Sequence, residues 1–378
     1  SCAEASPVAA NTLYQGHVPT YYTSNGGVDW KAMTGVHSDV HYIRHSPITK
    51  RLWLAGDGGI MRLSADGRTF VDHTNLGVSE IYEMGQHPFE LDHMLNGYQD
   101  CGSKYYTGNR WISRVGADGI DCIFDPVDPT YYFTTIQYGD IRRHIGGPDG
   151  KVSNFPDPQD EGPWVSPIWV DIKDPNILYT GQNAFYRYRN AREDRPKKDN
   201  WETLDNGLPK AGEYLEIEQN EAAPQIMYVS NGSFVFRTWN VYADEPVWEN
   251  LAGNYPATAA VLDIESSPSD SDLLIISMNR KVFRSTDGGE SFTQFSEGLP
   301  DRSPIYALQF DHITGHLYSG TEAGIFLLLK GDSVWREFNQ GMSLTAPVYD
   351  LEIFYNAENH DNSMIKAATF GRGMWESP

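Results

Sequence analysis

An octet that recurs along the chain, Ser285-Thr-Asp287-Gly-Gly289-Glu-Ser-Phe292, indicates a repeating fold. Thr23-Ser-Asn25-Gly-Gly27-Val-Asp-Trp30 keeps the same spacing, and Ser64-Ala-Asp66-Gly67-Arg-Thr-Phe70 is one residue shorter. In such a turn the Asp or Asn side chain accepts backbone hydrogen bonds, and glycine supplies the positive φ. We therefore expect structural roles in a strand-connecting turn for Ser285, Asp287, Gly289 and Phe292.

A second pattern gives the period of the repeat. An apolar pair follows a turn residue in Asn11-Thr-Leu13-Tyr14, Pro175-Asn-Ile-Leu178-Tyr179 and Pro224-Gln-Ile-Met227-Tyr228. In this register the chain divides into units that start near residues 1, 40, 79, 120, 166, 213, 259, 304 and 348. Their spacing of roughly 37 to 50 residues is the period of four-stranded propeller blades.

The units also share an aromatic residue at the outermost strand. The sequence has nine inner-strand patterns but eight such aromatic residues: Trp30, Phe70, Trp111, Phe155, Trp201, Trp248, Phe292 and Trp335. The last unit therefore lacks its outer strand, and the chain is expected to be an all-β propeller of about eight four-stranded blades over residues 1–378. The alternative is part of a larger or tandem propeller. The missing strand comes either from the N-terminal segment or from other polypeptide, which makes a second polypeptide a candidate partner.

Composition limits the function classes. With 29 Lys and Arg against 51 Asp and Glu, the net charge of −22 repels phosphate backbones and argues against nucleic-acid binding. The longest apolar run, around 325–329, is far shorter than the roughly 20 residues that span a bilayer, so no membrane span is predicted. An acidic surface suits divalent cations and uncharged partners such as glycans.

Three cysteines leave two readings open. Cys101 and Cys122 flank one repeat junction, where they are either a disulfide or two free thiols, and Cys2 is then left over. The lack of an initiator Met and of a signal-like N-terminus favours a mature or excised fragment.

Polar residues are densest between positions 37 and 125. They form His37-Ser-Asp39-Val-His41, Gly56-Asp57-Gly-Gly59, Gly97-Tyr98-Gln99-Asp100-Cys-Gly102 and Gly116-Ala-Asp118-Gly119. Because the inner strands of a propeller converge on its axis, residues from successive blades can meet at one site.

These motifs carry two resemblances. The octet resembles the Asp-box, or BNR repeat, of sialidase-like, sortilin-like and xyloglucanase-like β-propellers. The series from His37 to Asp118, with a closing Thr369-Phe-Gly-Arg-Gly-Met-Trp375, resembles large secreted bacterial proteins related to the sortilin (Vps10) and xyloglucanase-like propellers, often exported with a type IX sorting domain. The resemblance covers essentially the whole chain. It implies a propeller fold and a secreted or outer-surface location, and it implies no particular activity.

The first motif is a candidate metal site. His37, Asp39 and His41 alternate, so on a strand they share one face with successive members about 6.6 Å apart. Neighbours could share Ca²⁺ or another divalent ion. The alternative is a hydrogen-bonded network without metal.

The acidic residues of the motifs are candidate catalytic groups. Asp57, Asp100 and Asp118 stand beside glycines, which predicts carboxylates that cap backbone N–H groups in tight turns. The functional alternative is a glycoside hydrolase that draws an acid and a base, about 5 to 9.5 Å apart, from Asp39 and these three residues. Binding residues would then come from His37, His41, Gln99, Tyr98 and Trp111, the aromatic ones as sugar-stacking platforms.

No decisive catalytic set is present. The arginines are scattered and no Arg-Ile-Pro element occurs, which excludes a sialidase. We therefore expect a non-catalytic recognition or scaffold module for a glycan or protein partner, with a polysaccharide-cleaving glycoside hydrolase as the alternative.

Overall fold

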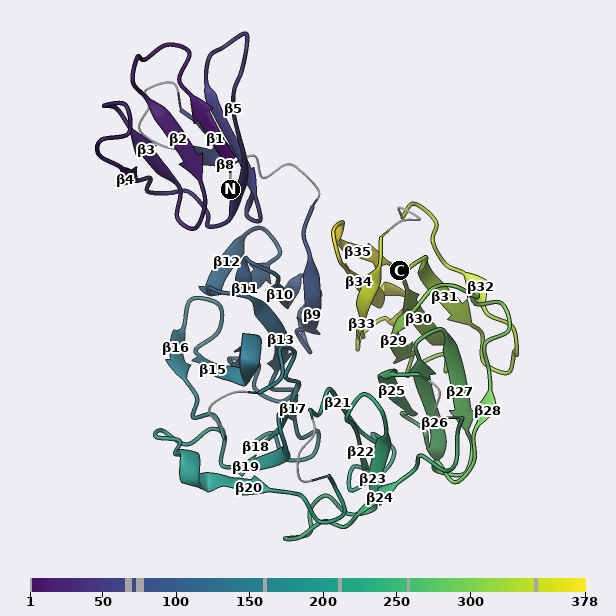
Figure 1. Ribbon diagram of the computed structural model, residues 1–378. Coiled ribbons are helices and arrows are strands. Elements are labelled where there is room, and N and C mark those ends of the chain that lie inside the picture. The colour runs from purple at the N-terminus through teal and green to yellow at the C-terminus, as the bar shows by residue number, and fades with distance from the viewer. Residues whose placement is uncertain are drawn as a thin grey trace. The chain divides into compact units, whose positions relative to one another are not determined.

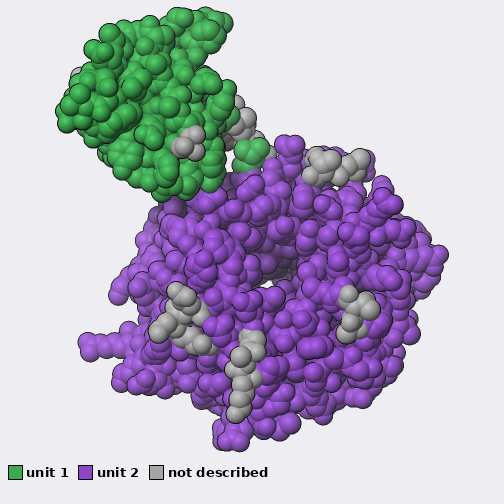
Figure 2. All heavy atoms as spheres, in the orientation of Figure 1, with its two compact units in different colours: residues 1–78 green, residues 79–378 purple. Residues whose placement is uncertain are grey.

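The computed structural model describes residues 2–64, 70–72, 78–158, 162–209, 213–256, 259–342 and 346–378. Asp66 and Gly67 of the shortened turn motif lie outside this range. The chain divides into two compact units, residues 1–78 and 79–378 (Figure 2).

Unit 1 holds two four-stranded antiparallel sheets. Their strands are β1 (Cys2–Ala5), β2 (Leu13–Gly16), β3 (Tyr21–Thr23) and β4 (Lys31–Ala32) in the first, and β5 (Val40–His45), β6 (Leu52–Gly56), β7 (Gly59–Leu63) and β8 (Phe70–Asp72) in the second.

Unit 2 holds seven antiparallel sheets, and in each of them consecutive strands are hydrogen-bonded neighbours. The first four sheets are β9 (Ile81–Gln86), β10 (His93–Tyr98), β11 (Gly102–Thr107) and β12 (Trp111–Val115); β13 (Gly119–Phe124), β14 (Tyr131–Ile136), β15 (Asp140–Ile145) and β16 (Lys151–Asn154); β17 (Ile168–Val170), β18 (Ile177–Gly181), β19 (Phe185–Arg189) and β20 (Trp201–Thr203); and β21 (Glu216–Gln219), β22 (Met227–Ser230), β23 (Val235–Thr238) and β24 (Trp248–Asn250).

The remaining sheets of unit 2 complete the strand order. They are β25 (Val261–Ser267), β26 (Asp270–Met278), β27 (Lys281–Ser285) and β28 (Thr293–Gln294); β29 (Ile305–Phe310), β30 (Leu317–Thr321), β31 (Gly324–Leu328) and β32 (Arg336–Glu337); and β33 (Val348–Phe354), β34 (Met364–Thr369) and β35 (Gly373–Ser377). Three short 3₁₀ segments, η1 (Gln137–Gly139), η2 (Lys198–Asn200) and η3 (His360–Asn362), lie in connections.

The seven sheets of unit 2 form a ring of blades around a central opening (Figures 1 and 2). The first strand of each blade lies innermost, and the ring closes where β33 meets β9. There the Met84 N–H donates to Asp350 Oδ2 (2.7 Å), and the Gly371 N–H donates to Ser79 O (2.8 Å). The predicted β-propeller class is thereby confirmed. Seven of the blades lie in unit 2 and two lie in unit 1, a division that agrees with the alternative of a larger or tandem propeller better than with one ring of about eight blades.

The blade formed by β33, β34 and β35 has three strands, whereas the other blades of unit 2 have four. Among the described residues, β35 pairs with β34 alone.

Aromatic side chains of the outermost strands hold neighbouring blades together. Trp248 and Trp335 are 4% and 2% exposed, and each packs against the preceding blade. The Trp248 N–H donates to Asn206 O (2.9 Å) in the loop between blades. Gly207 in this loop has φ +96°, and a Cβ there would lie 2.2 Å from Trp248 O, so the contact requires glycine.

The Ser285–Phe292 turn forms a local hydrogen-bond network. Ser285 Oγ donates to Asp287 Oδ1 (2.7 Å) and accepts from the Gly289 N–H (2.8 Å), while Asp287 Oδ1 also accepts from the Ser291 N–H (2.9 Å). Asp287 therefore orders the connection between β27 and β28.

The three cysteines are free thiols. The disulfide considered between Cys101 and Cys122 is not formed, because Cys122 is buried on β13 and its thiol donates to Glu83 O (3.6 Å) on the neighbouring inner strand. Cys101 lies instead in the turn between β10 and β11. In the part of the chain that the structure describes, no helix is long and apolar enough to cross a membrane.

Candidate functional site: the central channel of unit 2

Five of the seven inner strands of unit 2 have a β-bulge near their start. In β9, Ile81 pairs with Tyr98 and Met84 with Asn96, so two residues of the inner strand oppose one of β10. The strands β13, β25, β29 and β33 have the same irregularity near their starts. A bulge interrupts the period of two and re-aims neighbouring side chains. Consecutive residues at these starts therefore need not point to opposite faces.

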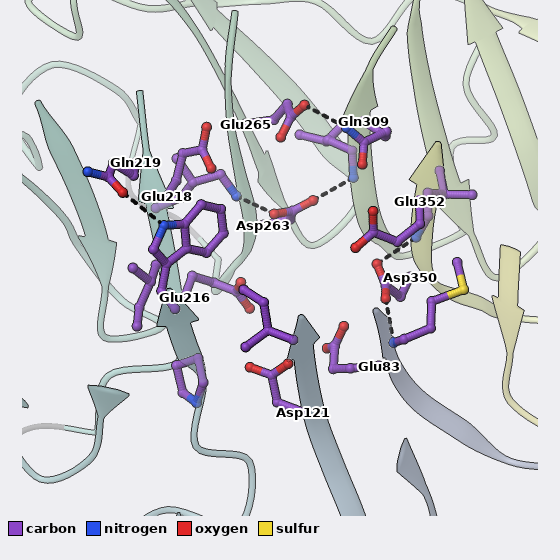
Figure 3. Close-up of a pocket in the computed structure, with 18 of the residues that line it drawn as sticks. Glu83, Asp121, Glu216, Glu218, Gln219, Asp263, Glu265, Gln309, Asp350 and Glu352 are labelled. Atoms are coloured by element: carbon purple, nitrogen blue, oxygen red, sulfur yellow. Dashed lines mark hydrogen bonds between the residues drawn. The ribbon is translucent and has the colours of Figure 1, made fainter. Parts of the chain in front are cut away.

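Acidic side chains from these strands surround the axis of the ring. We call the following residues the channel acids: Glu83, Asp121, Glu216, Glu218, Asp263, Glu265, Asp350 and Glu352. They line a cavity of about 350 Å³, and Figure 3 shows their carboxyl groups around one opening. They come from β9, β13, β21, β25 and β33, so the site exists only when the ring is closed.

Five of the eight channel acids accept a hydrogen bond from the backbone of the next blade. The bonds run from Ile168 N–H to Asp121 Oδ2 (2.8 Å), from Ser266 N–H to Glu218 Oε1 (2.9 Å), from Leu308 N–H to Asp263 Oδ2 (2.5 Å), from Phe310 N–H to Glu265 Oε1 (2.6 Å) and from Met84 N–H to Asp350 Oδ2 (2.7 Å). These hydrogen bonds join adjacent inner strands that share no sheet. The channel acids thus contribute to ring closure.

The same acids hold their protons more tightly than free carboxyl groups. Burial raises the pKa of Asp121 and of Asp263 to about 7, although backbone N–H groups that bind the ionised forms lower it. Burial likewise raises the pKa of Glu218 to about 8 and that of Asp350 to about 6. Burial and mutual repulsion raise the pKa well above the usual range in the remaining four, Glu83, Glu216, Glu265 and Glu352. Near neutral pH the channel is therefore partly protonated.

Aromatic side chains form a continuous group at one mouth of the channel. We call Tyr138, Trp164, Tyr82, Phe370, Tyr349 and Tyr306 the aromatic crescent. Neighbouring ring centroids are 5.3 Å apart for Tyr138 and Trp164, 5.6 Å for Tyr82 and Phe370, 4.9 Å for Phe370 and Tyr349, and 4.5 Å for Tyr349 and Tyr306. Trp164 Nε1 donates to Tyr82 OH (3.3 Å), and this bond connects the Tyr138–Trp164 pair to the other four rings.

The crescent lies directly next to the channel acids. Tyr82 and Tyr349 each precede a channel acid, Glu83 and Asp350, at a bulge. Trp164 and Tyr138 are 40% and 51% exposed, so their rings are accessible to a ligand.

Three residues expected from the sequence lie beside the crescent. Tyr82 OH donates to Gln99 Oε1 (3.0 Å), and the Asp100 N–H donates to Asp118 Oδ1 (2.7 Å). Asp118 thus caps a backbone N–H group, as its turn chemistry predicts, and Asp100 has φ +58°. The structure brings Gln99, Asp100 and Asp118 together at this mouth.

The other polar candidates lie in unit 1. The predicted alternation of His37, Asp39 and His41 is wrong, because β5 begins only at Val40 and Asp39 has φ +58°. His41 Nε2 contacts Asp57 Oδ1 (2.5 Å), and His37 Nδ1 contacts Ser38 O (2.9 Å). No group of three or more His, Cys, Asp or Glu side chains placed to hold a metal occurs among the described residues.

Tyr98 and Trp111 line a different cavity. It has about 400 Å³ and lies between β10, β11 and β12 on one side and β34 and β35 on the other. Tyr98 is 7% exposed and packs in the core, and Trp111, 42% exposed, stacks near Tyr106 with ring centroids 4.8 Å apart. Neither residue belongs to the crescent.

Sequence reasoning missed the channel acids and the crescent. A signal was present, because inner strands repeat an apolar residue, then an aromatic or apolar one, then an acid: Ile81-Tyr82-Glu83, Val261-Leu262-Asp263 and Val348-Tyr349-Asp350. Strict alternation would place the second and third residues on opposite faces of the sheet. The sequence pattern therefore did not indicate that both lie at the channel.

No protein-family model matches the chain, and no curated protein does. Solved structures that share its fold include two of YCF48. "YCF48 bound to D1 peptide" has a TM-score of 0.56 and 14% identity, and the likeness covers 79% of this chain and 91% of that chain. YCF48 from Cyanidioschyzon merolae has a TM-score of 0.56 and 13% identity, over 79% of this chain and 94% of that chain. At these identities the likeness concerns the fold alone.

Proposed function

We propose that the chain is a non-catalytic recognition module whose aromatic crescent binds a protein or glycan partner. The observation that carries this proposal is the continuous contact of six partly exposed rings at the mouth of the channel. Rings of this kind stack on sugars and on peptide side chains. The solved structure of YCF48 with a D1 peptide offers a precedent for peptide recognition by a propeller of similar fold.

The hydrogen bonds of the predicted catalytic acids favour a non-catalytic role. Asp118 binds the Asp100 N–H, and Asp57 binds His41. Carboxylates engaged in this way support turns and loops, whereas a glycoside hydrolase needs an acid and a base that face a substrate.

Binding measurements with crescent variants test the proposal. The full chain and its Trp164→Ala and Tyr349→Ala variants would be applied to a glycan array and to phage-displayed random heptapeptides. We expect ligands that bind the wild type and lose about tenfold or more in affinity with either variant, since aromatic anchors dominate such sites.

Phe89→Ala is the matched control for these variants. Phe89 is 61% exposed and lies between β9 and β10, at the end of the inner strand opposite to the crescent. The Phe89→Ala variant should bind the selected ligands with the affinity of the wild type. If neither ligand set yields a binder, or if binders are indifferent to both crescent substitutions, the proposed function is wrong.

The channel acids favour glycoside hydrolysis as a second candidate. Asp121, with its pKa raised to about 7, has the protonation expected of a general acid, and other carboxyl groups surround it beneath a set of aromatic rings. A hydrolase would release reducing ends from a polysaccharide, and Asp121→Asn would abolish that release while the fold is retained. Absence of release from a panel of plant and bacterial polysaccharides would reject this candidate.

Three further expectations from the sequence stay proposals. Kinship with Asp-box propellers of the sortilin-like and xyloglucanase-like group is supported by the hydrogen-bonded Ser285–Phe292 turn. A secreted or outer-surface location rests on that resemblance, and fractionation of the source cells tests it. A second polypeptide that adds a strand to β35 is tested by intact mass under native conditions, where a heavier species is expected.

A further inference from the structure

Carboxylates flank the aromatic crescent on both sides. Tyr82 OH donates to Gln99 Oε1 (3.0 Å), the neighbour of Asp100 in the chain, and Glu80 pairs with Phe370 in an antiparallel β-bridge. Burial raises the pKa of Tyr82, the hydrogen bond with Trp164 lowers it, and the charges of Asp118 and Asp100 raise it. Burial raises the pKa of Tyr349, the hydrogen bond with Tyr306 lowers it, and the charges of Glu322 and Glu80 raise it. The crescent is therefore an apolar surface in a field of negative charge.

In the interior of the channel, the Asp350 carboxyl group, whose pKa burial raises to about 6, is largely ionised near neutral pH, whereas Glu83, whose pKa is raised well above the usual range, keeps its proton. Glu83 and Asp350 follow crescent residues directly in the chain and line the cavity. A ligand that lies on the crescent can thus project a group toward these carboxyl groups. Uncharged sugars would gain little from this arrangement, whereas a cation gains from both the ring faces and the carboxylates.

Resting on the proposed function, we infer that the crescent binds an extended polypeptide segment through a Lys or Arg side chain that enters the channel mouth. The ring faces hold the apolar part of the segment and the stem of the basic side chain. The charged end then lies toward Asp350 in the lining of the channel.

The dimensions of the crescent favour a polypeptide over a small amine. Neighbouring rings, with centroids 4.5 to 5.6 Å apart, follow one another across the mouth. An extended chain advances about 3.3 Å per residue, so several residues can lie along the rings at once. A free amine would occupy one or two of these contacts.

One basic residue of the protein lies in the turn that carries Phe370. Arg372 is exposed and its N–H donates to Thr369 Oγ1 (3.1 Å). Its positive charge reduces the attraction that the carboxylates around the crescent exert on a basic ligand. Arg372→Gln is therefore expected to strengthen binding, which is the opposite of the effect expected at the carboxylates.

The experiment uses displayed random heptapeptides selected on the wild-type full chain, with counter-selection on Tyr349→Ala. Retained peptides should be enriched in Lys or Arg next to an aromatic or apolar residue, relative to the starting library. The affinity of a selected peptide should fall by roughly three- to tenfold in a Glu80→Gln/Glu322→Gln variant and rise by about twofold or more in Arg372→Gln.

Glu245→Gln is the matched control for the charge variants. Glu245 is exposed in the loop between β23 and β24, at the opposite end of the blades from the crescent. Its substitution should leave the affinity unchanged within about 1.5-fold.

The outcomes separate this inference from the proposed function. Crescent-dependent peptides without enrichment in Lys or Arg, or glycans as the bound class, would overturn the inference and leave recognition intact. Indifference of the selected peptides to the Glu80 and Glu322 substitutions would overturn it as well. If nothing binds in a crescent-dependent way, both proposals fail.

Discussion

Glu218 makes the stability of the ring depend on pH in a predictable direction. It is 7% exposed, and its Oε1 accepts from the Ser266 N–H (2.9 Å) and Oγ (2.5 Å) of the next blade. Its pKa is raised to about 8, mainly by burial, whereas the unfolded chain has the ordinary value of 4.5. Between these values the native state holds a proton that the unfolded state has lost. Its contribution to stability is therefore present at low pH and is lost as pH rises through about 8.

The magnitude follows from proton linkage. Between pH 6.5 and 8, a native pKa of about 8 costs roughly 2 kcal/mol of the free energy of unfolding, and a native pKa of about 7 costs roughly 1 kcal/mol. Glu218 contributes the first amount, and Asp121 and Asp263 contribute the second amount each. These three acids together lower the stability by a few kcal/mol over this range.

Two buried histidines oppose this trend. Burial lowers the pKa of His87 to about 4 and that of His144 to about 3, so both are neutral in the native state. Their contribution is lost as pH falls through the unfolded value of about 6.5, and it still grows by less than about 1 kcal/mol each between pH 6.5 and 8. The raised pKa values of Glu83, Glu216, Glu265 and Glu352 act in the same direction as that of Glu218. The net expectation is therefore a fall of at least about 2 kcal/mol.

Urea unfolding at pH 6.5 and pH 8 measures this fall in the wild type and in Glu218→Gln. Glutamine keeps the acceptor for Ser266 and resembles the protonated acid, so the fall of the variant over the same range should be roughly 2 kcal/mol smaller than that of the wild type. Glu245→Gln, at an exposed site, should behave like the wild type. A wild-type stability that is constant or rises with pH, or an equal fall in Glu218→Gln, would refute the reasoning.

Three further predictions concern single residues of unit 2 and the thiols. Trp335→Ala removes a side chain that is 2% exposed and whose Nε1 donates to Phe295 O (2.8 Å), so urea unfolding should show a loss of about 3–5 kcal/mol. Hydrogen bonds from Ser291 and Ser285 lower the pKa of Asp287 to about 2. Because Asp287 is exposed, Asp287→Ala should lower the free energy of unfolding by less than about 1 kcal/mol at pH 7. This loss should become smaller as the pH falls through 4 toward 2. Alkylation of the denatured chain without a reductant, followed by intact mass, should find three modified thiols, at Cys2, Cys101 and Cys122.

The fold could be predicted from the sequence because propeller blades are built from local patterns. The turn motif at Ser285–Phe292 and the apolar pairs indicated short antiparallel strands at a fixed period, and the inner strands β25 (Val261–Ser267) and β33 (Val348–Phe354) begin close to two of the expected unit starts. The partition into seven and two blades could not be predicted in the same way. It depends on which inner strands meet, and the β33–β9 contact joins residues that are far apart in the sequence.

The candidate site was predicted in part. Gln99, Asp100 and Asp118 lie at the channel mouth because turns between the second and third strands of a blade end there together with the loops between blades. The candidate metal site was not obtained, since a spacing of two residues predicts a common face only inside a regular strand, and Asp39 with φ +58° precedes β5. Distances between carboxyl groups of different blades depend on tertiary structure and are not contained in local patterns.

The bulged starts of the inner strands link stability to recognition. At Tyr349 and Asp350, one extra residue lets an aromatic ring lie in the crescent while the next side chain binds the Met84 N–H of the adjacent blade. In a regular strand these two side chains would point to opposite faces of the sheet, so either the Tyr349 ring would leave the crescent or the Asp350 hydrogen bond to Met84 would be lost. A substitution that removes the ring alone should therefore alter binding with little effect on stability, whereas one at the acid should alter ring closure. Comparing Tyr349→Ala with Asp350→Ala in both assays tests this separation, and equal losses of stability in the two variants would contradict it.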